Sequence, residues 1–138
     1  STSSRGLGDV YKRQLYISNM IKFISGRIKG IYYSVKGAFY LIKTEHSIQV
    51  QLFIALLFVI GGRYLDLSNT EWLFVSLAIS LVLTAESLNS AIEKVADFIH
   101  PDYNKKIGLI KDVSAGAVFF AVLFALAVVY FVYIPKIL

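Results

Sequence analysis

Four polar side chains follow one another at helical spacing in the run AESLNSAIEKVAD, and three of them are acids. They are Glu86, Asn89, Glu93 and Asp97. At about 100° per residue they fall within an arc of about 80° on a helix, so they form one polar stripe. The apolar residues before Glu86 indicate a membrane segment, where an ionised carboxylate costs several kcal/mol unless it is paired, hydrated or metal-bound. We therefore expect the stripe to have a function.

Further charges stand at the ends of the neighbouring apolar segments. Glu45 precedes the first segment, and Lys111 and Asp112 precede the last. Carboxylates without His or Cys favour a hard cation such as Mg²⁺, which leaves coordination sites for water and phosphate oxygens. A lysine adds a point charge for phosphates. Together these groups suit phosphoryl transfer, in which a carboxylate inside the bilayer accepts a proton from a lipid hydroxyl.

Two other interpretations of the stripe use no catalysis. Glu86 and Asn89 could hydrogen-bond to neighbouring helices and hold an oligomer together. The acids could instead line the pore of a small channel, with Glu86 as an ion ligand. Both interpretations leave Glu45 and the Lys111–Asp112 pair unexplained.

The elements that carry these residues follow from composition. The chain has 138 residues, of which 57% are hydrophobic and 17% are charged, and a soluble chain this short cannot bury so many apolar side chains. The absence of cysteine excludes disulfides and thiolate metal sites. We expect an all-α integral membrane protein with one domain over residues 15–138. Its expected elements are a surface helix at about 15–43 and spanning helices at about 46–65, 72–92 and 113–134.

The N-terminal region divides into two parts. Residues 15–43 contain five basic residues and no acid, and Ile21, Ile24, Ile28 and Ile31 form an apolar stripe. This pattern predicts an amphipathic helix on an anionic membrane surface. The preceding run GLGDVYKRQ resembles a translated sequencing adaptor, and we expect residues 1–14 to be a non-native or disordered segment.

Loop charges predict the orientation. The segment before the first span and the segment 94–111 are rich in Lys and Arg, whereas the connection 63–71 and the C-terminus have one basic residue each. The positive-inside rule then puts the N-terminus and the 94–111 segment in the cytoplasm and the C-terminus outside. The formal charge of +5 could also indicate a nucleic-acid binder, but the apolar segments argue against that partner.

The two charged blocks carry a family resemblance. The run ESLNSAIEKVAD, followed after a short loop by KDVSAGAV, resembles the signature of the prokaryotic diacylglycerol kinase family, small membrane enzymes that include undecaprenol kinases. The similarity extends from about Tyr33 to the end of the third span. It implies ATP- and Mg²⁺-dependent phosphorylation of a membrane lipid alcohol, with diacylglycerol converted to phosphatidic acid, or undecaprenol as the alternative acceptor. It also implies a homotrimer in the bacterial cytoplasmic membrane, with active sites between subunits.

The resemblance implies roles for the residues of the stripe and its surroundings. Glu86 is the expected general base toward the lipid hydroxyl, and Asn89 orients it. Glu45 and Glu93 are expected to hold the Mg²⁺ that bridges the ATP phosphates. Lys111 is expected to contact those phosphates. Asp112 and Asp97 are expected to support the site.

The resemblance also reaches the surface helix and one loop. Ser34, Lys36 and Gly37 match the family's S-x-K-G stretch, near nucleotide and lipid, and Tyr33 and Tyr103 match adenine-side or loop positions. Two positions depart from the family pattern. Gln49 stands where an arginine is common, and Asn104 stands where some members have histidine.

Overall fold

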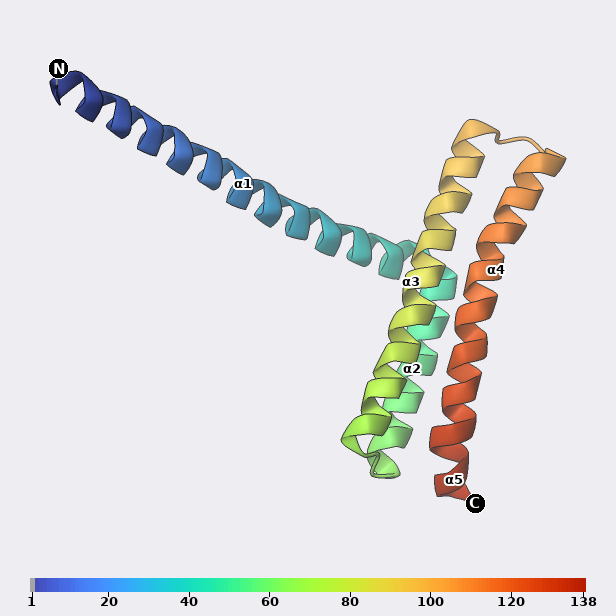
Figure 1. The fold of residues 1–138 in the computed structure, drawn as a ribbon. Coiled ribbons are helices and arrows are strands. Elements are labelled where there is room, and N and C mark those ends of the chain that lie inside the picture. Colours follow the sequence, from blue (N-terminus) through green and yellow to red (C-terminus); the bar gives the residue numbers. More distant parts are fainter. Residues whose placement is uncertain (1) are drawn as a thin grey trace. The chain divides into compact units, whose positions relative to one another are not determined.

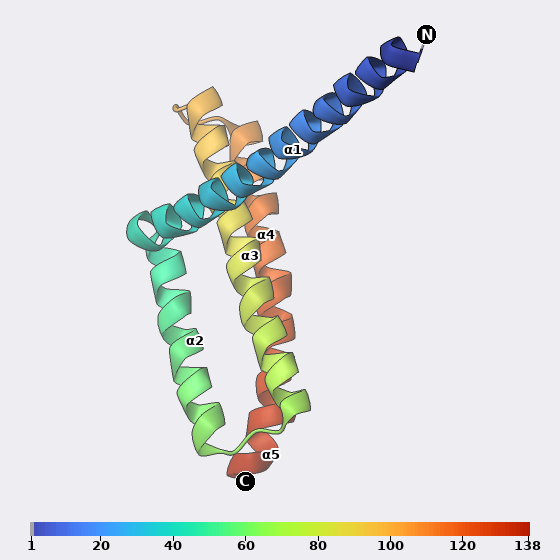
Figure 2. The ribbon, with the colours of Figure 1, turned by 90° about the vertical axis from the view of Figure 1, so that its left-hand side faces the viewer.

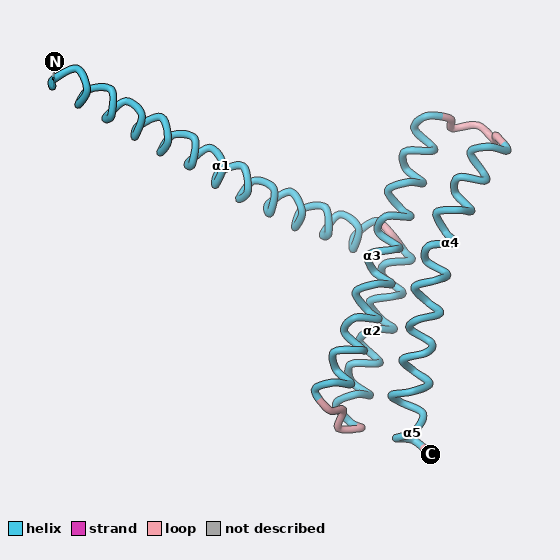
Figure 3. The backbone as a smooth tube through the Cα atoms, in the orientation of Figure 1, coloured by secondary structure: helices cyan, strands magenta, loops and turns pink. Residues whose placement is uncertain are grey.

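The computed structural model describes residues 2–138, with side chains from residue 5, and all of its regular elements are helical (Figures 1 and 3). The chain forms two compact units, one ending at Tyr40 and the other comprising Leu41–Leu138. The elements are α1 (Thr2–Thr44), α2 (His46–Tyr64), α3 (Asn69–Ile99), α4 (Lys105–Val128), the π-helix η1 (Val129–Tyr133) and α5 (Ile134–Ile137).

The first unit consists of most of α1. This helix begins at Thr2, not near residue 15, so the described part of the 1–14 segment is helical. The side chains from Arg5 to Tyr40 are exposed. The origin of residues 1–14 and the position of α1 on a membrane surface stay predictions.

Three helical stretches of the second unit are long and apolar enough to cross a membrane, which confirms the expected number of spans. They are His46–Tyr64, Asn69–Ile99 and Lys105–Ile137. The second continues well beyond the expected end at residue 92, and the third begins well before residue 113. The physical reason is that a run without charges marks the hydrocarbon layer, whereas backbone hydrogen bonding continues through charged residues into the interface.

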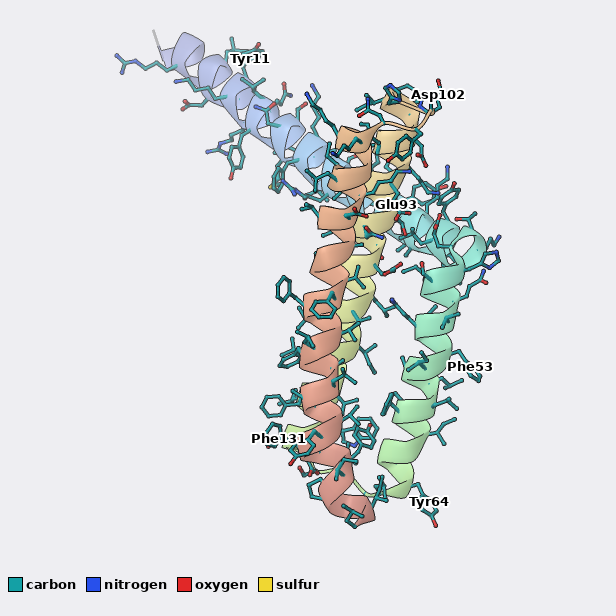
Figure 4. All side chains as sticks on the ribbon, turned by 90° about the vertical axis from the view of Figure 1, so that its right-hand side faces the viewer. Tyr11, Phe53, Tyr64, Glu93, Asp102 and Phe131 are labelled. Atoms are coloured by element: carbon teal, nitrogen blue, oxygen red, sulfur yellow. The ribbon has the colours of Figure 1, made fainter. Side chains whose placement is uncertain are left out.

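Apolar side chains cover the outside of these helices. Phe53 on α2 and Phe131 on η1 are 61% and 73% exposed, and Figure 4 shows both pointing away from the other helices. Such surfaces suit contact with lipid tails, because lipid solvates apolar side chains as well as a protein core does. The chain is accordingly a membrane protein.

The three spanning stretches pack together at the end opposite the polar stripe. α3 and α4 run antiparallel, joined by residues 100–104, and α2 lies beside them (Figure 2). Tyr133 ties α2 to η1, because its hydroxyl donates to the Phe58 carbonyl at 2.8 Å and the two rings pack edge to face. On α2, a Cβ added to Gly62 would lie 2.9 Å from Trp72, so glycine permits this close approach. The core side chains here are Leu67, Val75, Ala78, Val128, Val132 and Tyr133.

The turn between α2 and α3 positions the start of the helix that carries the stripe. Asp66 adopts a left-handed conformation with φ of 54°, which Asp tolerates better than most residues. Ser68 then caps α3 through a capping box: its side chain accepts from the Glu71 N–H at 3.3 Å, and Glu71 accepts from the Ser68 N–H at 2.7 Å. Lys136 contacts Glu71 at 3.2 Å and ties the end of the chain to this cap.

Ser68→Ala is expected to lower the free energy of unfolding by about 1 kcal/mol, because the Glu71 N–H loses its acceptor. Reversible unfolding in mixed detergent micelles measures this change. Ser76→Ala, an exposed serine within the same helix, is the matched control and should change stability by less than about 0.5 kcal/mol. Equal effects of the two substitutions would contradict the capping role.

Candidate active site

The four stripe residues lie on α3, and the two nearer its C-terminal end are the more exposed. Glu86 and Asn89 are 8% and 7% exposed, Glu93 is half-buried and Asp97 is exposed. Figure 4 labels Glu93 on this helix. One face of a single helix therefore carries polar groups from the buried part of the bundle to the exposed C-terminal end of α3.

Each of the two deeper carboxylates has an amide partner. Asn89 Nδ2 donates to Glu93 Oε1 at 3.2 Å, and Gln51 Nε2 on α2 donates to Glu86 Oε2 at 3.3 Å. Sequence reasoning did not identify Gln51. Its signal was present, since Gln51 is an amide that directly precedes the apolar run from Leu52 to Ile60, and a polar side chain within a spanning segment is costly without a partner.

Glu45, at the junction of α1 and α2, is held by Lys94 of α3. The Lys94 ammonium lies 2.6 Å from Glu45 Oε1, and the Glu45 side chain is 19% exposed. Thr44 also donates to this carboxylate, at 3.4 Å. The hydrogen bond from Lys94 is the largest cause that lowers the pKa of Glu45 below its ordinary value of 4.5, opposed by partial desolvation. The sequence indicated Lys94 only as one of the basic residues of a loop, because its partner Glu45 lies far away along the chain.

Lys94→Met is expected to raise the pKa of Glu45 toward 4.5, because the main group that favours the carboxylate is removed. A carboxyl group with a lowered folded-state pKa stabilises the fold above its unfolded-state pKa. This contribution disappears as the pH falls through the folded-state value. The wild type and the variant should therefore converge in stability at acidic pH. A carbon-13 titration of the Glu45 carboxyl measures the shift, and an unchanged pKa would contradict the ion pair.

A second ion pair joins α3 to α4. Lys111 Nζ lies 2.5 Å from Asp97 Oδ1, so Asp97 fixes the position of the lysine ammonium. Asp112 is exposed beside it. Tyr103, in the loop before α4, is 94% exposed.

The two departures from the family pattern have local structural roles. Gln49 Nε2 donates to the carbonyls of Ile42 and Lys43 at 3.0 and 3.4 Å, and thereby satisfies acceptors at the end of α1. Asn104 is the N-cap of α4, and its side chain accepts from the N–H groups of Lys106 and Ile107. Gln49 thus stabilises the end of α1 next to Glu45, and Asn104 stabilises the start of α4, the helix that carries Lys111.

The remaining expected residues lie on α1 in the N-terminal unit. Tyr33, Ser34, Lys36 and Gly37 are exposed there, and the Ser34 hydroxyl donates to the Gly30 carbonyl at 2.8 Å. Tyr33 packs edge to face with Tyr32. Their proximity to nucleotide and lipid stays a prediction.

Buried polar atoms without a partner occur on all three spanning helices. Among the residues whose side chains are described, they are Gln51 Oε1, Asn89 Oδ1 and Ser114 Oγ. α3 and α4 run antiparallel and are joined by the Lys111–Asp97 ion pair. Ser114 lies about one turn after Lys111 on α4, so it is roughly level with Lys94 on α3. Burial of such atoms costs free energy unless a ligand, water or another chain completes the hydrogen bonding.

The carboxylates also indicate how a cation could bind. From residue 5 to the C-terminus, no group of three or more His, Asp or Glu side chains is arranged to hold a metal. Glu45 and Glu93 supply only oxygen ligands. Mg²⁺ commonly uses one or two carboxylates and takes its other ligands from water and phosphates. Carboxylates of this kind therefore suit Mg²⁺ bound together with a nucleotide better than a metal held by protein alone.

Comparison with known proteins decides the family. The sequence model of the family described as prokaryotic diacylglycerol kinase matches residues 32–133. This range includes the whole stripe and the ion pairs Glu45–Lys94 and Asp97–Lys111. The chain belongs to the prokaryotic diacylglycerol kinase family. It is thus a lipid kinase, which uses ATP and a lipid as substrates, and a bacterial membrane protein.

Two curated relatives within the prokaryotic diacylglycerol kinase family differ in their named activity. An undecaprenol kinase of Bacillus subtilis is 30% identical over 94 residues, which cover 68% of this chain and 76% of that protein. A diacylglycerol kinase of Escherichia coli K12 is 32% identical over 81 residues, which cover 59% of this chain and 66% of that protein. Both match this chain at similar identity.

Proposed function

We propose that the protein transfers the γ-phosphoryl group of ATP to the hydroxyl of diacylglycerol and forms phosphatidic acid. The observation that carries this proposal is the stripe, which runs from the buried Glu86 to the exposed Asp97 beside Lys111. A lipid hydroxyl and a water-soluble nucleotide can meet only at such a junction. Undecaprenol is the second candidate acceptor, favoured by the Bacillus subtilis relative.

Glu86 acts as general base in the proposed reaction. The lipid oxygen attacks the γ-phosphorus, its proton passes to the Glu86 carboxylate, and the bond to the β-phosphate oxygen breaks to release ADP. Gln51 holds one oxygen of Glu86 at 3.3 Å and leaves the other for the hydroxyl. Asn89 lies about one turn from Glu86 along α3 and donates to Glu93. Burial of Glu86 keeps water away from the proton transfer.

The nucleotide end of the site uses charged residues. Glu45 and Glu93 would hold Mg²⁺, which neutralises charge on phosphate oxygens when bound. Lys111, held by Asp97, contacts the phosphates, and Asp112 supports this arrangement. Tyr33, Tyr103, Ser34, Lys36 and Gly37 contribute from α1 and the loop as the family resemblance implies.

We further propose a homotrimer with cytoplasmic active sites. The unpartnered buried atoms of Gln51, Asn89 and Ser114 support a site that other molecules complete. Small residues at the start of the third span permit close helix approach, namely Ser114, Ala115, Gly116 and Ala117. The basic N-terminal segment and the 94–111 segment support a cytoplasmic location for the site, with the C-terminus outside.

Purified protein with labelled ATP, Mg²⁺ and a panel of lipid alcohols tests the acceptor. We expect labelled phosphatidic acid to be the main product. Labelled undecaprenyl phosphate as the main product would establish the second candidate. No labelled lipid in any reaction would overturn the proposal, and ion flux without ATP consumption would support the channel interpretation.

A further inference from the structure

Lys94, on α3, neutralises one of the acids of the candidate active site. Its ammonium lies 2.6 Å from Glu45 Oε1, and the Thr44 hydroxyl donates to the same oxygen at 3.4 Å. In the proposed mechanism Glu45 binds Mg²⁺, and Lys94 has no role. A carboxylate carries a single negative charge, which a bound dication more than neutralises, so the ammonium is then no longer attracted to it. Binding of the metal at Glu45 therefore favours departure of Lys94.

The exposure of the two side chains permits this exchange. The Lys94 side chain is 48% exposed, whereas that of Glu45 is 19% exposed. An ion pair with a half-exposed lysine is held weakly, because water solvates the ammonium nearly as well as the carboxylate does. A lysine also reaches several positions, since its ammonium is a compact charge on a flexible four-carbon stem. The ammonium of Lys94 can thus move at little cost while the Glu45 carboxylate stays in place.

Lys94 borders the polar stripe near the C-terminal end of α3. It lies three residues before Asp97, about one turn along the helix and roughly 60° around it. Asp97 pairs with Lys111, the lysine that is proposed to contact the ATP phosphates. The two lysines therefore approach the same exposed part of α3 from different helices. Phosphates bound at Lys111 would attract the displaced ammonium of Lys94, because several negative charges are then concentrated there.

We propose that Lys94 is a counter-ion that Glu45 exchanges for Mg²⁺, and that its ammonium then binds a phosphate of the nucleotide. The inference rests on the proposed function, since it takes Glu45 as a ligand of the metal. Without nucleotide, the protein loses the Lys94–Glu45 ion pair when the metal binds. With nucleotide, a phosphate replaces the lost partner of the ammonium. Lys94 thereby couples the two ligands, and each raises the affinity of the protein for the other.

Lys94→Met tests the exchange, with Mn²⁺ as the probe and electron paramagnetic resonance as the measurement of binding. Without nucleotide, we expect the variant to bind Mn²⁺ about fivefold more tightly than the wild type, because no ammonium competes for Glu45. A non-hydrolysable ATP analogue should tighten Mn²⁺ binding by the wild type, and this gain should be about tenfold smaller in the variant. Lys105→Met, at an exposed lysine that begins α4, is the matched control and should keep both wild-type values. If Lys94→Met does not fold, Lys94→Gln removes the same charge.

Glu45→Gln separates failure of the exchange from failure of the metal assignment. If Glu45→Gln weakens Mn²⁺ binding but Lys94→Met leaves the nucleotide-free affinity unchanged, the exchange is overturned and Glu45 is still a ligand. Weaker nucleotide-free binding by Lys94→Met would also overturn it, since Lys94 would then only position Glu45. If Glu45→Gln binds Mn²⁺ as the wild type does, the metal assignment fails and the exchange fails with it. In the Glu45→Gln background, Lys94→Met should no longer change the Mn²⁺ affinity, because the carboxylate for which the two cations compete is gone.

Discussion

Glu86→Gln is expected to lower kcat for lipid phosphorylation by about 10²–10⁴-fold, the range that a positioned general base typically contributes. The neutral amide has nearly the same shape and still offers an oxygen to Gln51, so folding and substrate binding should change little. A radiolabel assay on the purified protein, with KM for ATP and lipid measured separately, checks this expectation.

Asp102→Asn provides the matched control for charge removal. Asp102 lies in the exposed loop between α3 and α4, and the proposed mechanism uses no part of it. The control should keep wild-type turnover. Near-normal turnover of Glu86→Gln would exclude Glu86 as the base, even if the protein is a kinase.

Glu93→Gln is expected to have the second large effect on activity, because Glu93 is a proposed ligand of Mg²⁺. The amide oxygen can still accept from Asn89 Nδ2, so the substitution removes charge while it preserves the hydrogen bond within the stripe. Loss of a ligand to a catalytic cation costs several kcal/mol, which corresponds to a decrease in kcat/KM of roughly a hundredfold or more. The Mg²⁺ concentration needed for half-maximal activity should rise.

Direct binding separates the metal role from a general loss of activity. Mn²⁺ added with a non-hydrolysable ATP analogue reports occupancy by electron paramagnetic resonance, and Glu93→Gln should bind it more weakly than the wild type. The Asp102→Asn variant again serves as control. An unchanged Mn²⁺ affinity and an unchanged Mg²⁺ requirement would exclude Glu93 as a ligand.

Sequence reasoning succeeded for features that depend on local periodicity. The spacing of Glu86, Asn89, Glu93 and Asp97 put them on one helix face, and the structure has them on α3. The apolar runs predicted the number of spans. The first apolar run gave the bounds of α2 to within one residue, whereas α3 ends at Ile99 and α4 begins at Lys105, well outside the apolar runs. Absence of charge indicates the hydrocarbon layer and says little about where backbone hydrogen bonding stops.

By itself the sequence determined the membrane environment, the polar stripe and the family, since each of these depends on residues that are close together along the chain. Only the tertiary structure decided the partners: Gln51 for Glu86, Lys94 for Glu45 and Asp97 for Lys111. It alone revealed the apolar groove lined by Ala55, Ala78 and Ala125. The physical reason is that these contacts join side chains far apart along the chain. Their meeting depends on how whole helices pack, which no local pattern encodes.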